Sequence, residues 1–323
     1  MISFSKDKMM IKPEFWDYKN PNLLSKILFP FTLPVRVSNF FFKYFPKINN
    51  KKIISICVGN IYLGGTGKTP TTIKLYNLIR KLEKKIATGK KFHSSHQDEI
   101  KILKKKTFLV SKKSRNEIIK YAVKKGKKII IFDDGLQDKY IDYDIKFVCF
   151  DSLSGFGNGN LIPAGPLREG LSSIKRFDAV FIKKIKKKNK KIINTIKKIN
   201  PKIKIFNTRY KIKNKKNFDL SQKYLVFSGI GNSSSFYKFL INENFKIAKF
   251  LNYPDHYEYT NNDFKKIIDL AKKQSTSIIT TEKDFTKIPE KYKKKIKYIE
   301  VDLIIQNEFN LIKFLKSKID EKY

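Results

Sequence analysis

A glycine-rich stretch with a lysine and a threonine is the segment whose chemistry follows most directly from its residues. Residues 56–70 read Ile-Cys-Val-Gly-Asn-Ile-Tyr-Leu-Gly-Gly-Thr-Gly-Lys-Thr-Pro. A strand-to-helix turn of this kind presents backbone N–H groups and the positive end of a helix dipole to an anion. Lys68 would contact the β and γ phosphates of ATP, and the Thr69 hydroxyl would bind Mg²⁺. The predicted ATP-binding residues are Tyr62, Leu63, Gly64, Gly65, Thr66, Gly67, Lys68 and Thr69.

The loop departs from the Gly-x-x-x-x-Gly-Lys-Ser/Thr pattern at its first position, where Tyr62 replaces glycine. The neighbouring glycines compensate in part. The alternative is a glycine-rich turn with a chance Lys-Thr pair. The strand-forming residues 53–58 before the loop, and Pro70 in the first turn of the following helix, favour nucleotide binding.

Two aspartates that could bind the metal ion follow a second apolar run. Asp133 and Asp134 come directly after residues 128–132, which predict a buried strand. In a parallel sheet this position places an acidic side chain beside the phosphate loop. An ordinary Asp-Gly turn is the alternative.

The segment 155–169 is too long and too rich in glycine to be a simple connection. Ordered loops of this length commonly bind ligands. Arg168 would contact phosphate oxygens and Glu169 would join the metal site, whereas the alternative is a structural loop with an exposed Arg-Glu pair. The predicted metal ligands are therefore Thr69, Asp133, Asp134 and Glu169.

The composition is that of a globular protein large enough for two domains. The chain has 323 residues, 41% of them apolar, and a formal charge of +41. The charge favours an anionic partner such as a nucleotide, a phosphorylated lipid or an acidic membrane surface, although lysine-rich composition explains part of it. A nucleic-acid-binding module is the alternative, but the lysines are dispersed and no recognised nucleic-acid-binding signature occurs.

Strands that alternate with helices predict an α/β protein with two parallel sheets. Ser114 and Glu117 form a capping-box pattern at the start of a helix that ends at Lys125. A loop is expected from Ala87 to Gln97, and Cys57 and Cys149 are expected to be buried thiols. The predicted division is residues 1–48 (N-terminal segment), 49–208 (phosphate-loop domain), 209–221 (linker) and 222–323 (smaller α/β domain).

The segment from Phe15 to Phe45 mixes aromatic and aliphatic residues with Lys and Arg, and Pro30 and Pro34 divide it into short helices. This pattern suits a helical segment that lies in the membrane interface. A pair of helices that covers the core is the alternative. No signal peptide and no uncharged apolar stretch long enough to cross a membrane is found, so a peripheral protein is expected.

Six motifs in order along the chain resemble the tetraacyldisaccharide 4′-kinase family. Beyond the phosphate loop and the segment 155–169, they are Asp-Asp-Gly-Leu-Gln at 133–137, Gly-Ile-Gly-Asn at 229–232, Pro-Asp-His at 254–256 and Thr-Glu-Lys-Asp at 281–284. The resemblance implies transfer of the γ-phosphate of ATP to the 4′-hydroxyl of an acylated glucosamine disaccharide phosphate in lipid A biosynthesis. It also implies a place at the cytoplasmic face of the inner membrane, with no obligate protein partner.

The resemblance further implies the catalytic residues Asp98, His256, Lys68 and Arg168. Asp98 would accept the proton of the sugar hydroxyl, and His256 would orient it. Because the two residues lie in different halves of the chain, the pair would form only when the domains close around the substrates. A phosphate-loop kinase or ATPase with a different acceptor is the alternative.

Three positions depart from the family pattern. Residues 87–92 replace a common Ser-Arg-Gly-Tyr segment, Asp138 stands where a histidine is frequent, and Ser154 replaces an arginine. The roles of the missing side chains cannot be transferred. Lys90 and Lys91 are predicted to supply the missing positive charge to the acceptor.

Overall fold

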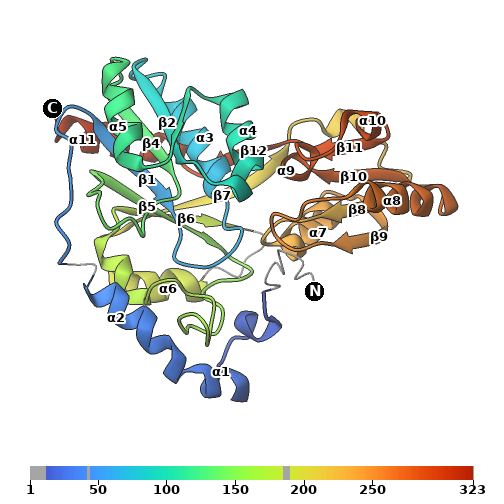
Figure 1. Ribbon diagram of the computed structural model, residues 1–323, viewed down its shortest axis with the longest axis horizontal. Helices are drawn as coiled ribbons and strands as arrows, with labels where there is room; N and C mark the ends of the chain where they lie inside the picture. The colour runs from blue at the N-terminus through green and yellow to red at the C-terminus, as the bar shows by residue number, and fades with distance from the viewer. Residues whose placement is uncertain (1–11, 42–43, 185–189, 323) are drawn as a thin grey trace, which may run out of the picture. The chain divides into compact units, whose positions relative to one another are not determined.

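The computed structural model describes residues 12–41, 44–184 and 190–322, which form two compact units (Figure 1). The larger unit consists of residues 14–211 and 302–323, and the smaller one chiefly of residues 212–301. The predicted domain division differs from these two units at the C-terminal end of the chain. Residues 302–323, which the sequence predicts to belong to the smaller domain, instead contribute β12 and α11 to the larger unit.

The larger unit is built on a sheet of eight strands in the order β12-β7-β6-β5-β1-β4-β2-β3. The pairs from β7 through β3 are parallel, as predicted for this half of the chain. The strands are β1 (Ile54–Gly59), β2 (Ile86–Lys91), β3 (Leu109–Lys112), β4 (Ile129–Asp133), β5 (Ile145–Asp151), β6 (Ala179–Lys183), β7 (Lys204–Ile212) and β12 (Val301–Ile305).

Helices cover both faces of this sheet. α3 and α11 pack on one apolar cluster, and α5 and α6 pack on the other. Ser114 caps α5 as predicted, with its hydroxyl bonded to the Glu117 carboxylate and backbone N–H. The helices of this part are α3 (Lys68–Ile79), α4 (Gln97–Lys106), α5 (Arg115–Lys124), α6 (Lys190–Ile199) and α11 (Glu308–Asp320). The sequence also predicts a very basic helix from Lys186 to Ile199. α6 forms residues 190–199 of it, and residues 185–189 lie outside the described residues.

The predicted loop from Ala87 is wrong for its first half, because β2 occupies residues 86–91 and is buried except at its last residue. Its sequence, Ile-Ala-Thr-Gly-Lys-Lys, lacks the apolar alternation that indicates a strand. Gly89 fits because a Cβ there would lie 2.9 Å from the ring of Phe132 and 3.0 Å from Ile118. Packing with neighbouring strands therefore decides the conformation of this segment.

The smaller unit has a sheet of four strands in the order β11-β10-β8-β9. The strands are parallel, as the sequence predicted. Apolar clusters cover both of its faces. Its strands are β8 (Lys223–Ser228), β9 (Lys246–Asn252), β10 (Ser277–Thr281) and β11 (Ile296–Ile299). Its helices are α7 (Ser233–Asn242), α8 (Asn261–Lys273), α9 (Glu282–Phe285) and α10 (Glu290–Lys293).

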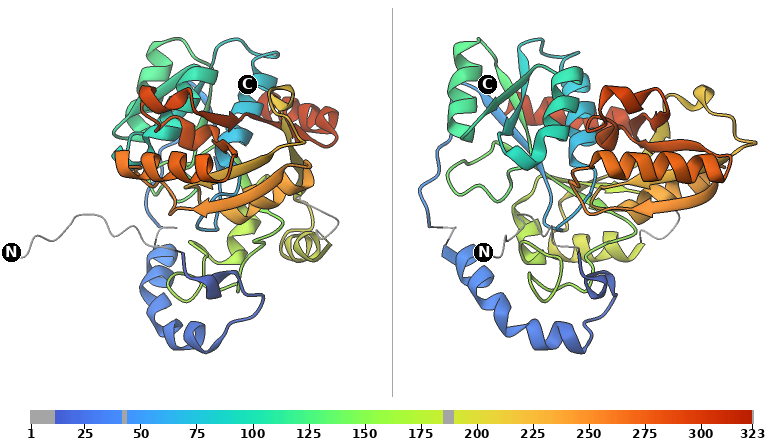
Figure 2. Two further views of the ribbon diagram at one scale, coloured as in Figure 1. Left: turned by 90° about the vertical axis from the view of Figure 1, so that its right-hand side faces the viewer. Right: turned by 45° about the vertical axis from the view of Figure 1, so that its right-hand side comes forward.

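The N-terminal segment forms short helices beside the segment 155–169 of the larger unit (Figure 2). The Ser25 hydroxyl donates to the backbone oxygen of Ala164 at 2.6 Å, and the Asn39 amide donates to that of Arg168 at 3.0 Å. Among the described residues, no helix has the length and apolar character needed to span a membrane. The helical pieces are η1 (Glu14–Asp17), α1 (Leu23–Leu28), η2 (Pro30–Thr32) and α2 (Leu33–Phe41).

A candidate nucleotide and phosphotransfer site

The glycine-rich loop connects β1 to α3 and has the backbone that an anion-binding turn requires. Gly64 and Gly67 have φ angles of 138° and 89°, which residues with a Cβ rarely adopt. The Asn60 amide donates to the backbone oxygens of Tyr62 and Gly64 at 2.5 and 3.1 Å and so fixes the first half of the loop. Lys68 and Thr69 then begin α3, with Gly67 as its N-cap.

Tyr62 is tolerated at the first position of the loop because its side chain and backbone make structural contacts there. Tyr62 does not have a positive φ angle, so this position does not require glycine. Its ring packs with Leu161 and Leu167, and its hydroxyl donates to the Asp17 carboxylate. Burial and the Asp17 carboxylate raise the pKa of Tyr62 well above its ordinary value. The side chain therefore joins the loop to the N-terminal segment.

Asp133 lies at the end of β4, next to the start of α3. Its Oδ2 atom accepts hydrogen bonds from the Thr69 hydroxyl at 2.8 Å and from Lys90 Nζ at 2.9 Å. A hydroxyl and a carboxylate are the oxygen ligands that Mg²⁺ takes from a protein when phosphates and water complete its shell. No group of three or more His, Cys, Asp or Glu suited to a metal ion occurs in the described part of the chain. Thr69 and Asp133 therefore fit Mg²⁺ only as a site shared with the nucleotide.

Asp134 follows in a strained backbone conformation, with a φ angle of 67°. Its carboxylate lies 3.5 Å from Lys68 Nζ and 3.4 Å from Arg168 Nη1. Burial raises the pKa of this carboxyl group, but Lys68, Arg168 and Lys90 lower it more, so that the net pKa is well below its ordinary value. Three of the predicted site residues thus meet in one charged cluster.

The Glu169 carboxylate contacts Arg176 and Gln137, which are not among the predicted metal ligands. Its carboxylate forms an ion pair with Arg176 and accepts a hydrogen bond from the Gln137 amide at 2.8 Å. The same amide donates to the backbone oxygen of Asn60 at 2.9 Å, which ties this carboxylate to the start of the glycine-rich loop. A part for Glu169 in metal binding stays a prediction.

Lys90 also belongs to this charged cluster. The sequence did not reveal that its side chain is buried there. It is only 3% exposed, and its Nζ atom lies 2.9 Å from Asp133 Oδ2 and 2.5 Å from Glu99 Oε2. Burial lowers the pKa of Lys90, but the two carboxylates raise it more, and the group remains charged. The ammonium group pairs with these two carboxylates in the structure, and a role for Lys90 in supplying positive charge to the acceptor stays a prediction. Lys91 is exposed, and the prediction also stays open for that residue.

Asp98 lies in the first turn of α4, directly before the partner of Lys90. It is 2% exposed, and its Oδ1 atom accepts a hydrogen bond from the backbone N–H of Glu99 at 2.7 Å. The positive end of the helix dipole stabilises a carboxylate at this position. Lys90 thus connects the segment that carries Asp98 to Asp133.

His256 belongs to the smaller unit, where three motifs meet. Its φ angle is 60°, and its backbone N–H donates to the oxygen of Gly229 at 3.2 Å. Lys283 Nζ lies 3.2 Å from His256 Nε2.

Asp284 holds these motifs in place. Its buried carboxylate accepts hydrogen bonds from the Gly229 backbone N–H at 3.1 Å and from the Thr281 hydroxyl at 2.7 Å. The Thr-Glu-Lys-Asp motif thus combines a lysine that contacts His256 with an aspartate that fixes the loop beside it. The sequence alone indicated only that the motif follows a strand.

Comparison with known proteins identifies the family. The family described as "LpxK: Tetraacyldisaccharide-1-P 4'-kinase" matches residues 23–89 and 90–320. The chain is 43% identical to a tetraacyldisaccharide 4'-kinase of Pelagibacter ubique over 311 residues, which cover 96% of this chain and 98% of the relative. A second relative of the same name, from Rickettsia akari, is 31% identical over 92% of this chain and 94% of its own length. This chain belongs to the tetraacyldisaccharide-1-P 4'-kinase family.

A solved structure supports the fold. The structure of LpxK from Aquifex aeolicus in complex with ATP matches with a TM-score of 0.66 at 21% identity, over 92% of this chain and 100% of that one. The phosphate-loop α/β fold predicted from the sequence is therefore confirmed.

One position at which this member departs from the pattern of the tetraacyldisaccharide-1-P 4'-kinase family has a structural explanation. Asp138 accepts a hydrogen bond from Arg115 Nη1 at 2.8 Å, and Arg115 Nη2 donates to the backbone oxygen of Asp134, also at 2.8 Å. Asp138 thus helps to hold the strained turn at Asp134 in place.

Proposed function

We propose that the protein transfers the γ-phosphate of ATP to the 4′-hydroxyl of a tetraacyldisaccharide 1-phosphate, which gives lipid IVA in lipid A biosynthesis. Membership of the tetraacyldisaccharide-1-P 4'-kinase family supports this reaction. The observation that carries the proposal is a hydrogen bond of 2.8 Å from the Thr69 hydroxyl to the Asp133 carboxylate. Thr69 is the residue that follows Lys68 in the loop. It joins the phosphate loop to the carboxylate that a phosphate-loop kinase needs.

In this proposal the loop 62–69 binds the phosphates of ATP through its backbone N–H groups and the start of α3. Lys68, which contacts Asp134 at 3.5 Å, would contact the β and γ phosphates instead. Arg168 contacts the same carboxylate and would stabilise the charge that develops on the transferred group. Thr69 and Asp133 would hold Mg²⁺, which neutralises phosphate charge.

Asp98 and His256 would act on the acceptor. A sugar hydroxyl is a weak nucleophile, and a carboxylate that accepts its proton during the transfer increases its reactivity. Asp98 is the proposed base, and His256 is proposed to orient it and to tune its basicity. The fixed backbone of His256 and its contact with Lys283 support a positioning role.

The N-terminal segment is proposed to place the enzyme on an anionic membrane, at the cytoplasmic face of the inner membrane. Nine large apolar side chains between residues 23 and 41 are exposed, and Leu23, Phe31 and Leu33 are each more than 60% exposed. Arg36 lies 4.5 Å from the ring centroid of Phe29, which places a cation beside an exposed aromatic ring. This combination suits the lipid interface, where the acylated substrate resides.

Acceptor dependence tests the proposed reaction. ADP release should be slow with ATP and Mg²⁺ alone and should rise at least tenfold when detergent-dispersed tetraacyldisaccharide 1-phosphate is added. The same lipid with its 4′-hydroxyl removed is the matched control and should give no stimulation. Rapid ADP release that is independent of the lipid would instead favour an ATPase or a kinase with another acceptor.

A further inference from the structure

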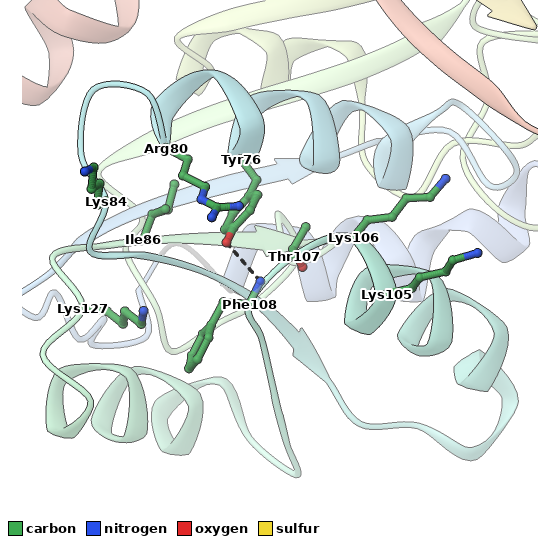
Figure 3. A pocket seen from close by; sticks show the side chains of 9 residues that line it. All are labelled: Tyr76, Arg80, Lys84, Ile86, Lys105, Lys106, Thr107, Phe108 and Lys127. Carbon is green, nitrogen blue, oxygen red and sulfur yellow. Dashed lines mark hydrogen bonds between the residues drawn. The ribbon is translucent and has the colours of Figure 1, made fainter. Parts of the chain in front are cut away.

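Basic side chains surround a hollow of about 420 Å³ in the larger unit (Figure 3). Five of the nine residues that line it are Lys or Arg, and none is acidic. In the whole chain 70 of 323 residues are basic, so the hollow is much richer in cations than the composition alone would give. The basic residues are Arg80, Lys84, Lys105, Lys106 and Lys127.

The hollow lies at the edge of the sheet opposite the phosphate loop. Arg80 is the C-cap of α3, and Lys105 and Lys106 lie in the last turn of α4. Ile86 begins β2, and Phe108 directly precedes β3. Parallel strands begin at one edge and end at the other, and Lys68, Asp133 and Asp98 follow the strand ends. The hollow is therefore separate from the nucleotide site.

Ordered residues form its walls. The Tyr76 hydroxyl accepts a hydrogen bond from the backbone N–H of Phe108 at 3.2 Å, and both Tyr76 and Ile86 are buried. Phe108 is 41% exposed, and Lys127 Nζ lies 3.9 Å from its ring centroid. Figure 3 shows Arg80, Tyr76 and Phe108 near the centre, with Lys84 and Lys127 to one side.

Stabilisation of helix ends explains only some of these cations. Lysines in the last turn of a helix interact favourably with its dipole, which is sufficient reason for Lys105 and Lys106. Lys84 and Lys127 lie outside helices, in the connections before β2 and β4. Like charges that gather around one hollow without a lining carboxylate repel each other, and a bound anion would relieve the repulsion.

We propose that this hollow binds a soluble anion that carries two or more phosphate groups. Several cations around one hollow match the charge of linked phosphates better than that of a monovalent anion. The exposed apolar helices of the same unit bond to Ala164 and Arg168 of the segment 155–169. This segment is in turn bonded to residues 61 and 63, directly after β1, so the proposed membrane-binding surface lies at the edge of the sheet opposite the hollow. The ligand is therefore assigned to the aqueous phase.

The test uses the full chain with Lys68→Ala, which weakens phosphate binding at the nucleotide loop. Tripolyphosphate is titrated by calorimetry into this protein and into the same protein with Arg80→Ala, Lys105→Ala and Lys127→Ala. The matched control carries Lys265→Ala, Lys272→Ala and Lys273→Ala, which remove the same charge from exposed positions of α8. Thermal melting checks that each variant is folded. If the triple variant melts early, Lys105→Ala/Lys127→Ala is compared with Lys272→Ala/Lys273→Ala.

The proposal predicts at least a tenfold weaker affinity in the hollow variant and less than a twofold change in the control. Equal loss in the two variants, or no measurable tripolyphosphate binding before the hollow is altered, would overturn it. A parallel titration with ATP identifies the ligand class: equal affinity indicates that only phosphates are bound, and tighter binding indicates that a base also contacts Phe108.

Discussion

In the larger unit, Asp133 and Asp134 are held by the cations of Lys90, Lys68 and Arg168, whereas in the smaller unit His256 is fixed by its backbone and contacts Lys283 and Asp255. Both groups lie where parallel strands end. The first is a dense set of opposite charges, of which Lys68 and Arg168 are proposed to contact phosphates when ATP binds. The second presents one titratable ring in a fixed orientation. In the proposed mechanism, the larger unit binds the nucleotide and supplies the base Asp98, while the smaller unit contributes His256, which would orient that base.

Removal of the Lys68 side chain is expected to cause the largest loss of phosphate transfer. Lys68→Ala should lower kcat/KM for ATP by roughly a thousandfold, because a cation directed at the transferred phosphate is lost. Lys74→Ala, which removes the same charge from α3, is the control and should change kcat/KM less than threefold. The measurement is steady-state transfer to the lipid acceptor, and near-normal turnover in Lys68→Ala would contradict the assignment of the phosphate loop.

His256→Ala should show whether the two units have different roles in catalysis and in ATP binding. We expect kcat to fall about a hundredfold, since orientation of the catalytic base is lost, while the Kd for ATP changes little. Exposed His93, which bonds Ser95, gives the control His93→Ala with normal turnover. Equal loss of ATP affinity in His256→Ala would remove the distinction between the units.

The sequence predicted the two sheets and most elements because buried strands and capped helices carry local signals. It also placed Lys68 correctly at the start of a helix after the loop, and Asp133 and Asp134 correctly at the end of a strand. It could not predict that Lys90 is buried, because the carboxylates that neutralise it come from β4 and α4, far along the chain. Similarly, β12 joins the larger sheet through long-range pairing beside β7, which no local pattern indicates.

Lys90→Met should reveal how strongly the charged cluster depends on its buried cation. Removal of one partner leaves buried carboxylates without their counter-charge, and we expect a loss of about 3–5 kcal/mol in the free energy of unfolding. Exposed Lys91→Met is the matched control and should be nearly neutral. Mg²⁺ should raise the melting temperature of Lys90→Met more than that of the wild type, because it also neutralises Asp133. The absence of any destabilisation would show that the cluster does not need this cation.

The smallest expected effect is on how the stability of the fold depends on pH. Since the pKa of Asp134 is lowered in the folded state, its charge stabilises the fold above its unfolded pKa, and this contribution is lost as pH falls toward the folded value. The difference in melting temperature between wild type and Asp134→Asn should therefore shrink between about pH 5 and about pH 3. Exposed Asp269→Asn is the matched control variant, and a constant difference for Asp134→Asn would exclude the proposed pairing.

The most direct test of the central claim follows the label from γ-³²P-ATP to the lipid. Wild-type protein with Mg²⁺ and tetraacyldisaccharide 1-phosphate should yield a lipid that carries the label at its 4′ position. Lys68→Ala and His256→Ala should each yield little of it, and only Lys68→Ala should also lose nucleotide binding. Label that remains in ATP or appears solely as inorganic phosphate with the wild-type protein would contradict the assignment of the two units.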